Sequence, residues 1–325
     1  MKNNWNQEED NIILNNWNKV KNITELTKFF DNRNYNAIKA RCAFLKLRKC
    51  YIYYKNDNFF SIPNLINSYW AGMLSTDGHL RVILRDGYES YQVQLGLKYD
   101  DIDHIKEFQM NANSNHKISI ITKNSIIKTN RNPNLENKIT TSKMAIIVFT
   151  KAKQWAEDLY KNWNIPIKNK TFDLKRPNIK DFHCCLAYLK ALLDGDGTII
   201  AAQFQKRMKN DRILKYKVMR LSFLGTEDLM NWVKEFTDKI CSHRKNNRHV
   251  RLERKDSNIY NYNIDGTDAA LLYDLLSELP CPSLYRKWNN KEVWDYVNKQ
   301  KLKFPDIFKE FKENSNSLSQ SIISV

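Results

Sequence analysis

Two stretches of the chain place apolar residues at helical spacing and stop at an aspartate followed by glycine. They are residues 70–78 and 189–197, and their aspartates are Asp77 and Asp196. A glycine at this point suits the left-handed turn that ends many helices. A carboxylate at the C-terminal end of a helix is unfavourably placed relative to the helix dipole. Because this occurs twice, the pattern indicates a cation that neutralises the carboxylates.

After each stretch the apolar period changes from 3.6 to 2, as in a β-strand. Leu80 and Val82 alternate with His79 and Arg81 up to an Asp-Gly turn signal at 86–87. One face of such a hairpin can lie on helices while the other shows polar side chains. We expect further strands near 91–97, 117–122, 145–149, 198–207, 215–224, 248–254 and 260–264, a bulge near 218–219, a polar loop over 123–142, and helices near 102–110, 155–163, 181–194, 268–276 and 291–299.

The surroundings of the two stretches repeat as well. Lys-Glu-Phe occurs at residues 106–108 and again at 234–236. The two aspartates are 119 positions apart, the two phenylalanines 128, and a third pair, Lys170 and Lys287, 117. Three landmarks at nearly one offset indicate a duplicated unit whose second copy has a longer hairpin.

The paired motifs resemble the signature of the LAGLIDADG homing endonucleases in their two-motif, single-chain form, over roughly residues 63–300. The resemblance implies an α+β fold of two pseudo-symmetric αββαββα repeats, at 63–176 and 177–300, with antiparallel DNA-binding sheets. It also implies that the two motif helices pack closely through small side chains four residues apart. The sequence departs from the family at Lys190, where a small residue is usual. The small residues expected at the helix contact are Gly72, Thr76, Ala191 and Gly195.

The same resemblance implies a metal-dependent hydrolysis of phosphodiesters. Asp77 and Asp196 would bind two or more Mg²⁺ ions, for which Mn²⁺ can substitute, and the carbonyls of Thr76 and Gly195 would assist them. Such ions lower the pKa of water and stabilise the attacking and leaving oxygens. Mg²⁺ prefers oxygen ligands and retains several waters, so one carboxylate per repeat is a sensible supply.

Two lysines match basic positions that the family keeps near the scissile phosphates. They are Lys170 and Lys287, and each could polarise water or stabilise the developing charge. Lys168 competes with the first for this role and Arg286 with the second. The alternative is that these lysines are only phosphate contacts or surface charges.

The charge of the chain favours a polyanionic partner. It has 53 Lys and Arg against 36 Asp and Glu, a formal charge of +17. We expect double-stranded DNA and no membrane, because no apolar run reaches the length of a bilayer span and no signal peptide opens the chain. The six cysteines lack metal-site spacing and predict a reducing intracellular compartment, either the cytoplasm or an organelle that contains DNA.

The polar faces of the expected strands carry the side chains that would meet DNA, since β-ribbons fit the major groove and Gln and Arg pair with base edges. Ordinary surface strands also have polar faces, and this prediction gains weight because the strands directly follow the two aspartates. The predicted contacts are His79, Arg81, Arg85, Gln92, Gln94, Gln203, Gln205, Arg207, Lys215, Lys217, Arg220, His249 and Arg251.

Residues 1–50 predict a small three-helix unit. Its last part, residues 33–49, holds six basic residues and no acidic one. The segment resembles a Myb-like helix-turn-helix, whose last helix would enter a major groove. The alternative is a packing module with a solvated basic face. In this unit the side chains expected nearest DNA are Asn34, Asn36, Lys39 and Arg41.

Residues 51–62 are expected to be a linker and residues 301–325 a mobile tail.

We therefore expect a monomeric, site-specific DNA endonuclease that cuts one phosphodiester in each strand of a long target. Since the ends of the sequence lack intein splicing residues, it would be free-standing or intron-encoded, and part of a mobile genetic element. The alternatives are an intron RNA maturase and a non-cleaving DNA-binding regulator on the same fold. A plain helix-turn-helix transcription factor would leave the duplicated portion unexplained.

Overall fold

The computed structural model describes residues 5–20, 22–47, 53–85, 87–127, 138–207, 213–241, 248–254 and 258–321. These residues divide into two compact units with the boundary at residue 52. No helix in these ranges is both long enough and apolar enough to cross a membrane.

The first unit is built from short α-helices whose N-termini are capped by asparagine side chains. Each of the three α-helices follows an asparagine whose side chain accepts a hydrogen bond from the backbone N–H three residues on. Ion pairs from Arg33 to Glu9 and from Arg41 to Asp10 connect the later part of the unit to its first helix. The elements are α1 (Gln7–Trp17), α2 (Ile23–Leu26), the 3-10 turn η1 (Thr27–Phe29) and α3 (Tyr35–Phe44). Their buried core consists of Ile13, Trp17, Val20, Leu26, Ile38 and Cys42.

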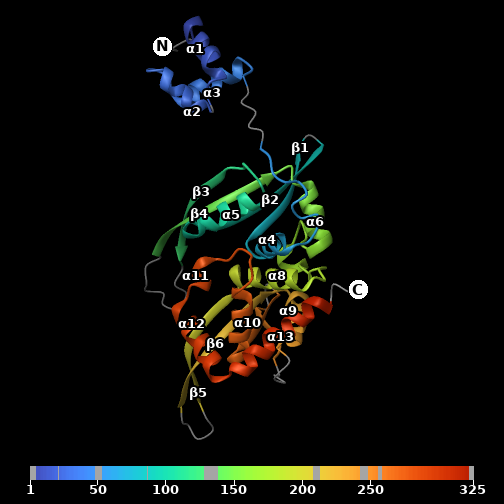
Figure 1. Ribbon diagram of the computed structural model, residues 1–325. Helices are drawn as coiled ribbons and strands as arrows, with labels where there is room; N and C mark the ends of the chain where they lie inside the picture. The colour runs from blue at the N-terminus through green and yellow to red at the C-terminus, as the bar shows by residue number, and fades with distance from the viewer. Residues whose placement is uncertain are drawn as a thin grey trace. The chain divides into compact units, whose positions relative to one another are not determined.

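The second unit contains the same succession of elements twice, so the predicted duplication is confirmed (Figure 1). The first copy comprises α4 (Leu65–Thr76), β1 (Gly78–Arg85), β2 (Tyr88–Lys98), η2 (Tyr99–Asp101), α5 (Ile102–Asn111), β3 (Ile118–Ile127), β4 (Lys138–Thr150), α6 (Lys153–Trp163) and α7 (Lys170–Asp173). The second comprises α8 (Phe182–Asp194), β5 (Thr198–Arg207), β6 (Ile213–Gly225), α9 (Glu227–Ile240), β7 (Arg251–Arg254), β8 (Ile259–Asp265), α10 (Thr267–Ser277), α11 (Tyr285–Trp288), α12 (Lys291–Lys303) and α13 (Pro305–Ser321).

Within the described residues, each copy forms one four-stranded antiparallel sheet, in the orders β1-β2-β4-β3 and β5-β6-β8-β7. Buried pairs such as Val93 with Phe149, and Leu221 with Ile264, occupy the face of each sheet that packs on helices. The other face of each sheet remains open. The predicted fold class, α+β with two repeated halves, is confirmed.

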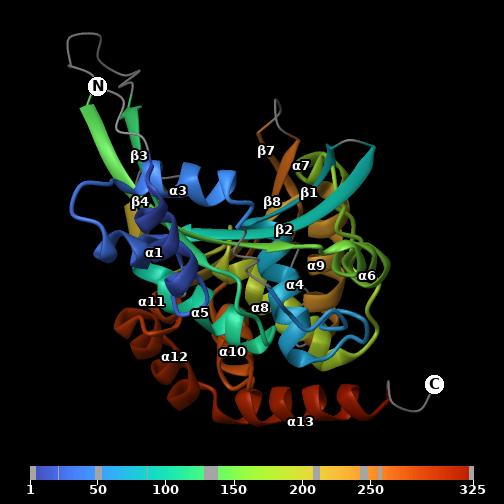
Figure 2. The same cartoon turned by 90° about the horizontal axis from the view of Figure 1, so that it is seen from above.

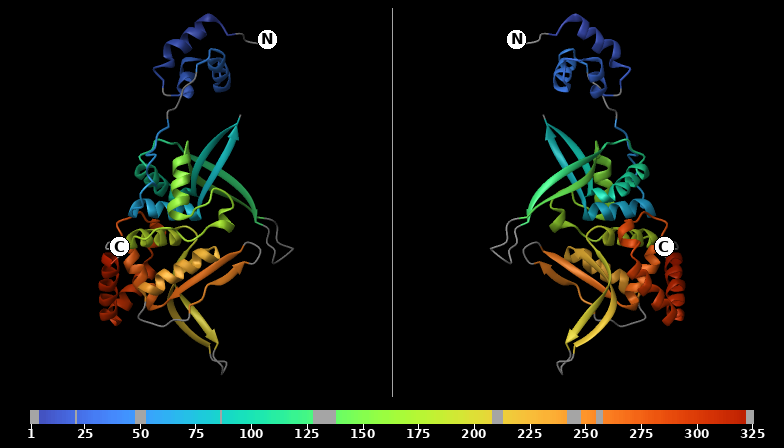
Figure 3. Two further views of the ribbon diagram at one scale, coloured as in Figure 1. Left: turned by 90° about the vertical axis from the view of Figure 1, so that its right-hand side faces the viewer. Right: turned by 90° about the vertical axis from the view of Figure 1, so that its left-hand side faces the viewer.

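The first helices of the two copies, α4 and α8, form the contact between them. Nearly every residue of α8 and most of α4 are buried. Figures 2 and 3 show the hairpins projecting to one side of this helix pair, while α12 and α13 lie on the other side. The ends of α4 and α8 therefore point toward the side that carries the open sheet faces.

Two predicted segments are wrong because apolar side chains tie them to the core. From residue 53 onward the expected linker belongs to the second unit, where Phe59 and Phe60 are buried. The expected mobile tail is helical up to Ser321, and α13 buries Phe308 and Phe311.

Two predicted strand details are also wrong. The expected loop over 123–142 is narrower, since β3 continues to Ile127 and β4 starts at Lys138; residues 128–137 lie outside the described ranges. The pairing of β5 with β6 is regular around residues 218–219, where a bulge was expected. An irregularity occurs instead in β7, between Leu252 and Arg254.

Candidate active site at the paired helix ends

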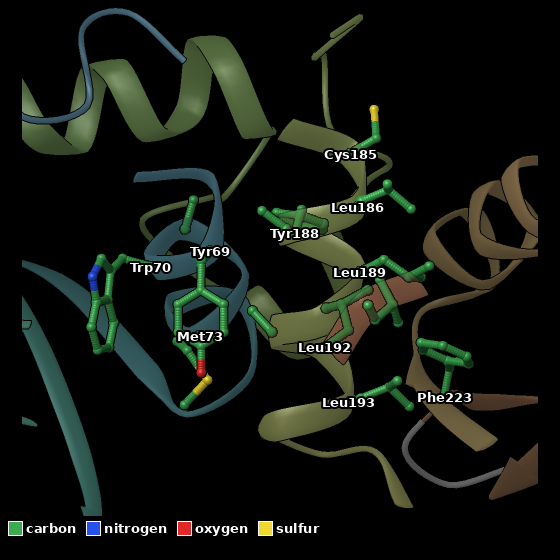
Figure 4. Packing of buried hydrophobic residues seen from close by; sticks show 14 of the residues in the cluster. Tyr69, Trp70, Met73, Cys185, Leu186, Tyr188, Leu189, Leu192, Leu193 and Phe223 are labelled. Atoms are coloured by element: carbon green, nitrogen blue, oxygen red, sulfur yellow. The ribbon is translucent and has the colours of Figure 1, made fainter. Parts of the chain in front are cut away.

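The two motif helices approach each other through small side chains, as predicted. A Cβ atom added to Gly72 would lie 2.6 Å from the Cβ of Ala191, and one added to Gly195 would lie 2.0 Å from Oγ1 of Thr76. Figure 4 shows α4 and α8 side by side, with Trp70 on the outer side of α4 and Leu193 on the side of α8 next to Phe223. The contact therefore brings the C-terminal ends of both helices together.

The glycines after the two aspartates are required by close packing and not by a left-handed turn. Among the described residues, positive φ in glycine occurs at Gly87 and Gly266. A Cβ on Gly78 would lie 2.4 Å from the carbonyl oxygen of Leu74, and one on Gly197 would lie 2.6 Å from Cα of Leu193. The predicted reason for these glycines is wrong, although their position is right.

The two aspartates lie at the surface where the helices end. Asp77 is the C-cap of α4, and Asp196 follows the C-cap Gly195 of α8. Surrounding protein atoms remove much of the hydration of Asp77, and the negative charge of Asp196 adds to this effect. Together they raise the pKa of the Asp77 carboxyl to about 6, against the opposing effect of Lys170 and Lys287.

Each helix end is held by one lysine that donates to three backbone carbonyls. Nζ of Lys170 lies 3.1, 2.5 and 2.6 Å from the carbonyl oxygens of Leu74, Thr76 and Gly78. Nζ of Lys287 lies 2.6, 2.9 and 2.8 Å from those of Leu193, Gly195 and Gly197. Every accepting residue in the second set stands 119 positions after its counterpart in the first. The two lysines are therefore equivalent parts of a repeated site.

Burial lowers the pKa of both lysines to about 8. The aspartates of the site act in the opposite direction and favour the charged form. The two competing candidates lie elsewhere: Lys168 is exposed, and Arg286 pairs with Asp101 at 3.1 Å. Of the four candidates, Lys170 and Lys287 are therefore the ones that the structure places at the helix ends beside the acids.

A buried carboxylate, which the sequence analysis missed, holds the segment that carries Lys287. Asp194 accepts hydrogen bonds from the Tyr69 hydroxyl at 2.6 Å, the Leu284 backbone N–H at 2.9 Å and the Trp288 ring N–H at 2.6 Å. Burial raises the pKa of Asp194. These contacts tie α8 to the first repeat and to α11. Position 75 of the first repeat, which corresponds to 194, holds a serine whose hydroxyl donates to its own helix.

A cavity of about 350 Å³ opens beside Asp196. Residues of both repeats line it: Lys170, Thr171 and Leu174 from the first, and Asp196 and Leu229 from the second. The site is therefore recessed on this side and can admit a group larger than water.

The residues present fit a divalent cation. No group of three or more His, Cys, Asp or Glu side chains could hold a metal ion in the part of the chain that the structure describes. A cation here would take Asp77 and Asp196 as side-chain ligands and complete its shell with water and phosphate oxygens, as Mg²⁺ commonly does. Lost hydration is the main cause of the raised pKa of Asp77, and the negative charge of Asp196 adds to it; a cation bound here would oppose both effects. The carbonyls of Thr76 and Gly195, expected as further ligands, accept hydrogen bonds from the lysines.

The first sheet places its predicted DNA contacts on the open face. His79 pairs with Gln94 and Arg81 with Gln92, and Nε of Arg81 donates to Oε1 of Gln92 at 2.8 Å. The buried residues Leu80, Val93 and Leu95 alternate with them on the opposite face. The side chain of Arg85 lies outside the described part of the structure.

Four predicted contacts in the second sheet lie on the face opposite the open one. Gln203 pairs with Lys217 and Gln205 with Lys215, which puts all four on the same side as the buried pair Ala201 and Met219. They are exposed because the hairpin extends beyond the core. The open face instead carries residues 198, 200, 202 and 204. The side chain of Arg207 is outside the described part.

Arg220 and Arg251 do lie on the open face of the second sheet. Arg220 pairs with Asp265 through two hydrogen bonds of 2.6 and 2.9 Å, so its charge is largely balanced there. Arg251 is exposed and pairs in register with Asn261. His249, just before β7, is exposed as well.

The four residues singled out in the first unit have different roles. Asn34 caps α3, and Arg41 is held by Asp10 at 2.5 and 2.7 Å, so both serve the fold of this unit. Asn36 and Lys39 are exposed on α3. These two remain the side chains best placed to meet a partner.

No protein-family model matches the sequence, and no curated protein matches it. Some solved structures do match. The LAGLIDADG meganuclease I-AabMI bound to uncleaved DNA is 11% identical, with 79% of this chain and 98% of that chain covered and a TM-score of 0.43. The I-LtrWI LAGLIDADG homing endonuclease bound to target DNA is 12% identical, with 82% and 97% covered and a TM-score of 0.41. I-DmoI in complex with DNA and Ca is 14% identical, with 74% and 97% covered and a TM-score of 0.41.

Proposed function

We propose that the second unit is a site-specific endonuclease that hydrolyses one phosphodiester in each strand of double-stranded DNA with divalent metal ions. The observation that carries this proposal is the repeated pairing of one exposed carboxylate with one carbonyl-bound lysine at two contacting helix ends. One such pair can serve one strand, and two related pairs can serve both. Because one chain holds both pairs, the active form is a monomer.

The chemistry follows from the charges at the site. A divalent ion, Mg²⁺ or Mn²⁺, would lower the pKa of water and neutralise charge on the attacking and leaving oxygens. Asp77 and Asp196 supply the negative charge that holds such ions. With pKa values of about 8, Lys170 and Lys287 are mostly charged at neutral pH and can stabilise the negative charge that develops on phosphate. Their three carbonyl contacts fix each ammonium beside an acid.

Binding of DNA is favoured by the formal charge of +17 and by the open sheet faces that start at the two acids. In the first unit, which we propose to be a Myb-like helix-turn-helix, Asn36 and Lys39 would contact DNA and lengthen the bound site. Deleting residues 1–52 should weaken affinity more than it slows cleavage of bound DNA. Unchanged affinity after this deletion would remove the first unit from the proposal.

The test of cleavage uses the full chain, Mg²⁺ and a supercoiled plasmid that carries the DNA flanking its own coding sequence. We expect linear product at one site, and none from the Asp77→Asn or Asp196→Asn proteins. The matched control is Asp103→Asn, an exposed acid outside the site, which should cut normally. Binding without any strand scission would instead indicate a regulator, and stimulation of intron splicing without scission would indicate an RNA maturase.

A further inference from the structure

The two open sheet faces start at equivalent points but carry different chemistry. Side chains alternate along a strand, so residues 79, 81 and 83 share the open face of β1, and residues 198, 200, 202 and 204 share the open face of β5. The registers of β1 with β2 and of β5 with β6 are regular over these positions. Equivalent residues of the two repeats can therefore be compared one by one.

The first repeat presents hydrogen-bonding groups next to its acid. His79 and Arg81 stand opposite Gln94 and Gln92, and Ile83 stands opposite Ser90. The 2.8 Å hydrogen bond from Arg81 to Gln92 orients both side chains on the open face. This face can donate to and accept from base edges.

The second repeat presents mostly apolar groups in the same places. Ile200, Ala202 and Phe204 follow Thr198, and all three are partly exposed. Ala202 stands opposite Val218, and Phe204 stands opposite Tyr216, whose exposed fraction is 42%.

On this part of the second face, the positive charge of Arg220 is already engaged. Arg220, opposite Ile200, is bound by Asp265, and its guanidinium lies 4.8 Å from the centre of the Phe204 ring. Arg220 therefore packs against Phe204, and its charge is paired with Asp265.

These groups correspond to different base edges in the major groove. Arg pairs with guanine and Gln with adenine, whereas Ala, Phe and the methyl of Thr contact the 5-methyl group of thymine. We propose that the two halves of the DNA target are read differently, the first by hydrogen bonds and the second by apolar contact with thymine methyl groups. This inference rests on the proposed DNA-binding function and names the kind of target that the function requires.

The test starts by selecting duplexes from a randomised library with the full chain, in buffer without Mg²⁺. Selection with the Arg81→Ala protein identifies the half contacted by the first repeat, because base preference is lost there. In the other half we expect thymines close to the centre. A selected half without thymine would overturn the proposal.

Replacing thymine by deoxyuridine then removes only the methyl group. We expect each replacement in the second half to weaken binding about fourfold, the effect of one buried methyl-sized group, and replacements in the first half to have little effect. The Phe204→Ala protein should lose part of this sensitivity. The exchange Ile200→Arg, which copies the first repeat, should replace one thymine preference by guanine.

The outcomes separate this inference from the proposed function. Equal sensitivity to deoxyuridine in both halves, with cleavage intact, would overturn the base-reading proposal alone. A chain that selects no sequence and cuts no DNA would overturn both.

Discussion

Replacing Asp77 with asparagine should abolish double-strand cleavage of DNA and, without metal, make the second unit more stable. The carboxyl of Asp77 has a pKa of about 6 in the folded protein, so its charged form is less favourable there than in the unfolded chain. Asparagine keeps the size of the side chain and removes the charge. The repulsion from Asp196 and the cost of lost hydration disappear with it.

The size of the gain follows from the pKa. A rise from 3.8 to about 6 corresponds to about 3 kcal/mol at pH 7, since one pKa unit is 1.36 kcal/mol. Solvent reaches Asp77 and screens part of this energy, so we expect about 1–2 kcal/mol. At about 2–4 °C per kcal/mol, the Tm should rise by about 2–8 °C.

The gain depends on pH in a defined direction. Below about pH 4 Asp77 is protonated in both the folded and the unfolded chain, and its ionisation costs no stability. As the pH rises through about 6, the folded protein must release a proton that it holds more tightly, and stability falls. The difference in Tm between Asp77→Asn and the natural chain should therefore be small at low pH and largest above about pH 7.

The assay is calorimetric melting of both proteins in EDTA at several pH values, with Asp103→Asn as the control for loss of an exposed acid. Adding Mg²⁺ should raise the Tm of the natural chain more than that of Asp77→Asn, because a bound ion stabilises the state that binds it. If Asp77→Asn is no more stable than the natural chain near neutral pH in EDTA, the electrostatic reasoning is refuted. If it still cuts both strands of the DNA, the role of Asp77 as a metal ligand is refuted.

Four further substitutions test the rest of the site. Lys170→Met and Lys287→Met should each slow cleavage of one strand, so that nicked plasmid accumulates on a gel; equal loss on both strands would argue against one lysine per strand. Asp194→Asn should lower stability by about 3–5 kcal/mol in denaturant unfolding, since buried donors lose their charged acceptor, and should slow the same strand as Lys287→Met. Gly72→Val should lower the Tm, because the added atoms overlap Ala191 and overpacking costs about 1–3 kcal/mol; an unchanged Tm would contradict the close helix contact.

The sequence could predict the parts of the site that are local. The helices, the acids at their ends and the small residues between them follow from spacing within a few residues, and the structure has them at the expected positions. Lys170 and Lys287 are far from the acids in the chain, and they were identified by the repeated offset together with the family resemblance. The offset was informative because in both repeats the lysine donates to the equivalent carbonyl at the end of the motif helix.

The failures have physical causes that differ from one another. Gln203 and Gln205 were assigned to the wrong face because the hairpin extends past the core, where both faces are polar or exposed. In β5 the even-numbered residues from 198 to 204 lie on the open face, since Ile199 and Ala201 are buried on the other. Asp194 was missed because its partners, such as Tyr69 and Trp288, come from distant segments. In the tail, the abundance of Ser and Asn concealed the helical spacing of apolar residues.

The lysines of the site explain why its acids remain available for a metal. The last carbonyls of a helix have no partner within the helix and carry partial negative charge. Lys170 and Lys287 donate hydrogen bonds to these carbonyls, so their positive charge mainly stabilises the helix ends. Their effect on Asp77 is too small to offset lost hydration and the neighbouring acid, since its pKa still rises to about 6. The fold thus holds two like charges close together without balancing them, and a divalent cation between the acids and a phosphate would supply the missing positive charge.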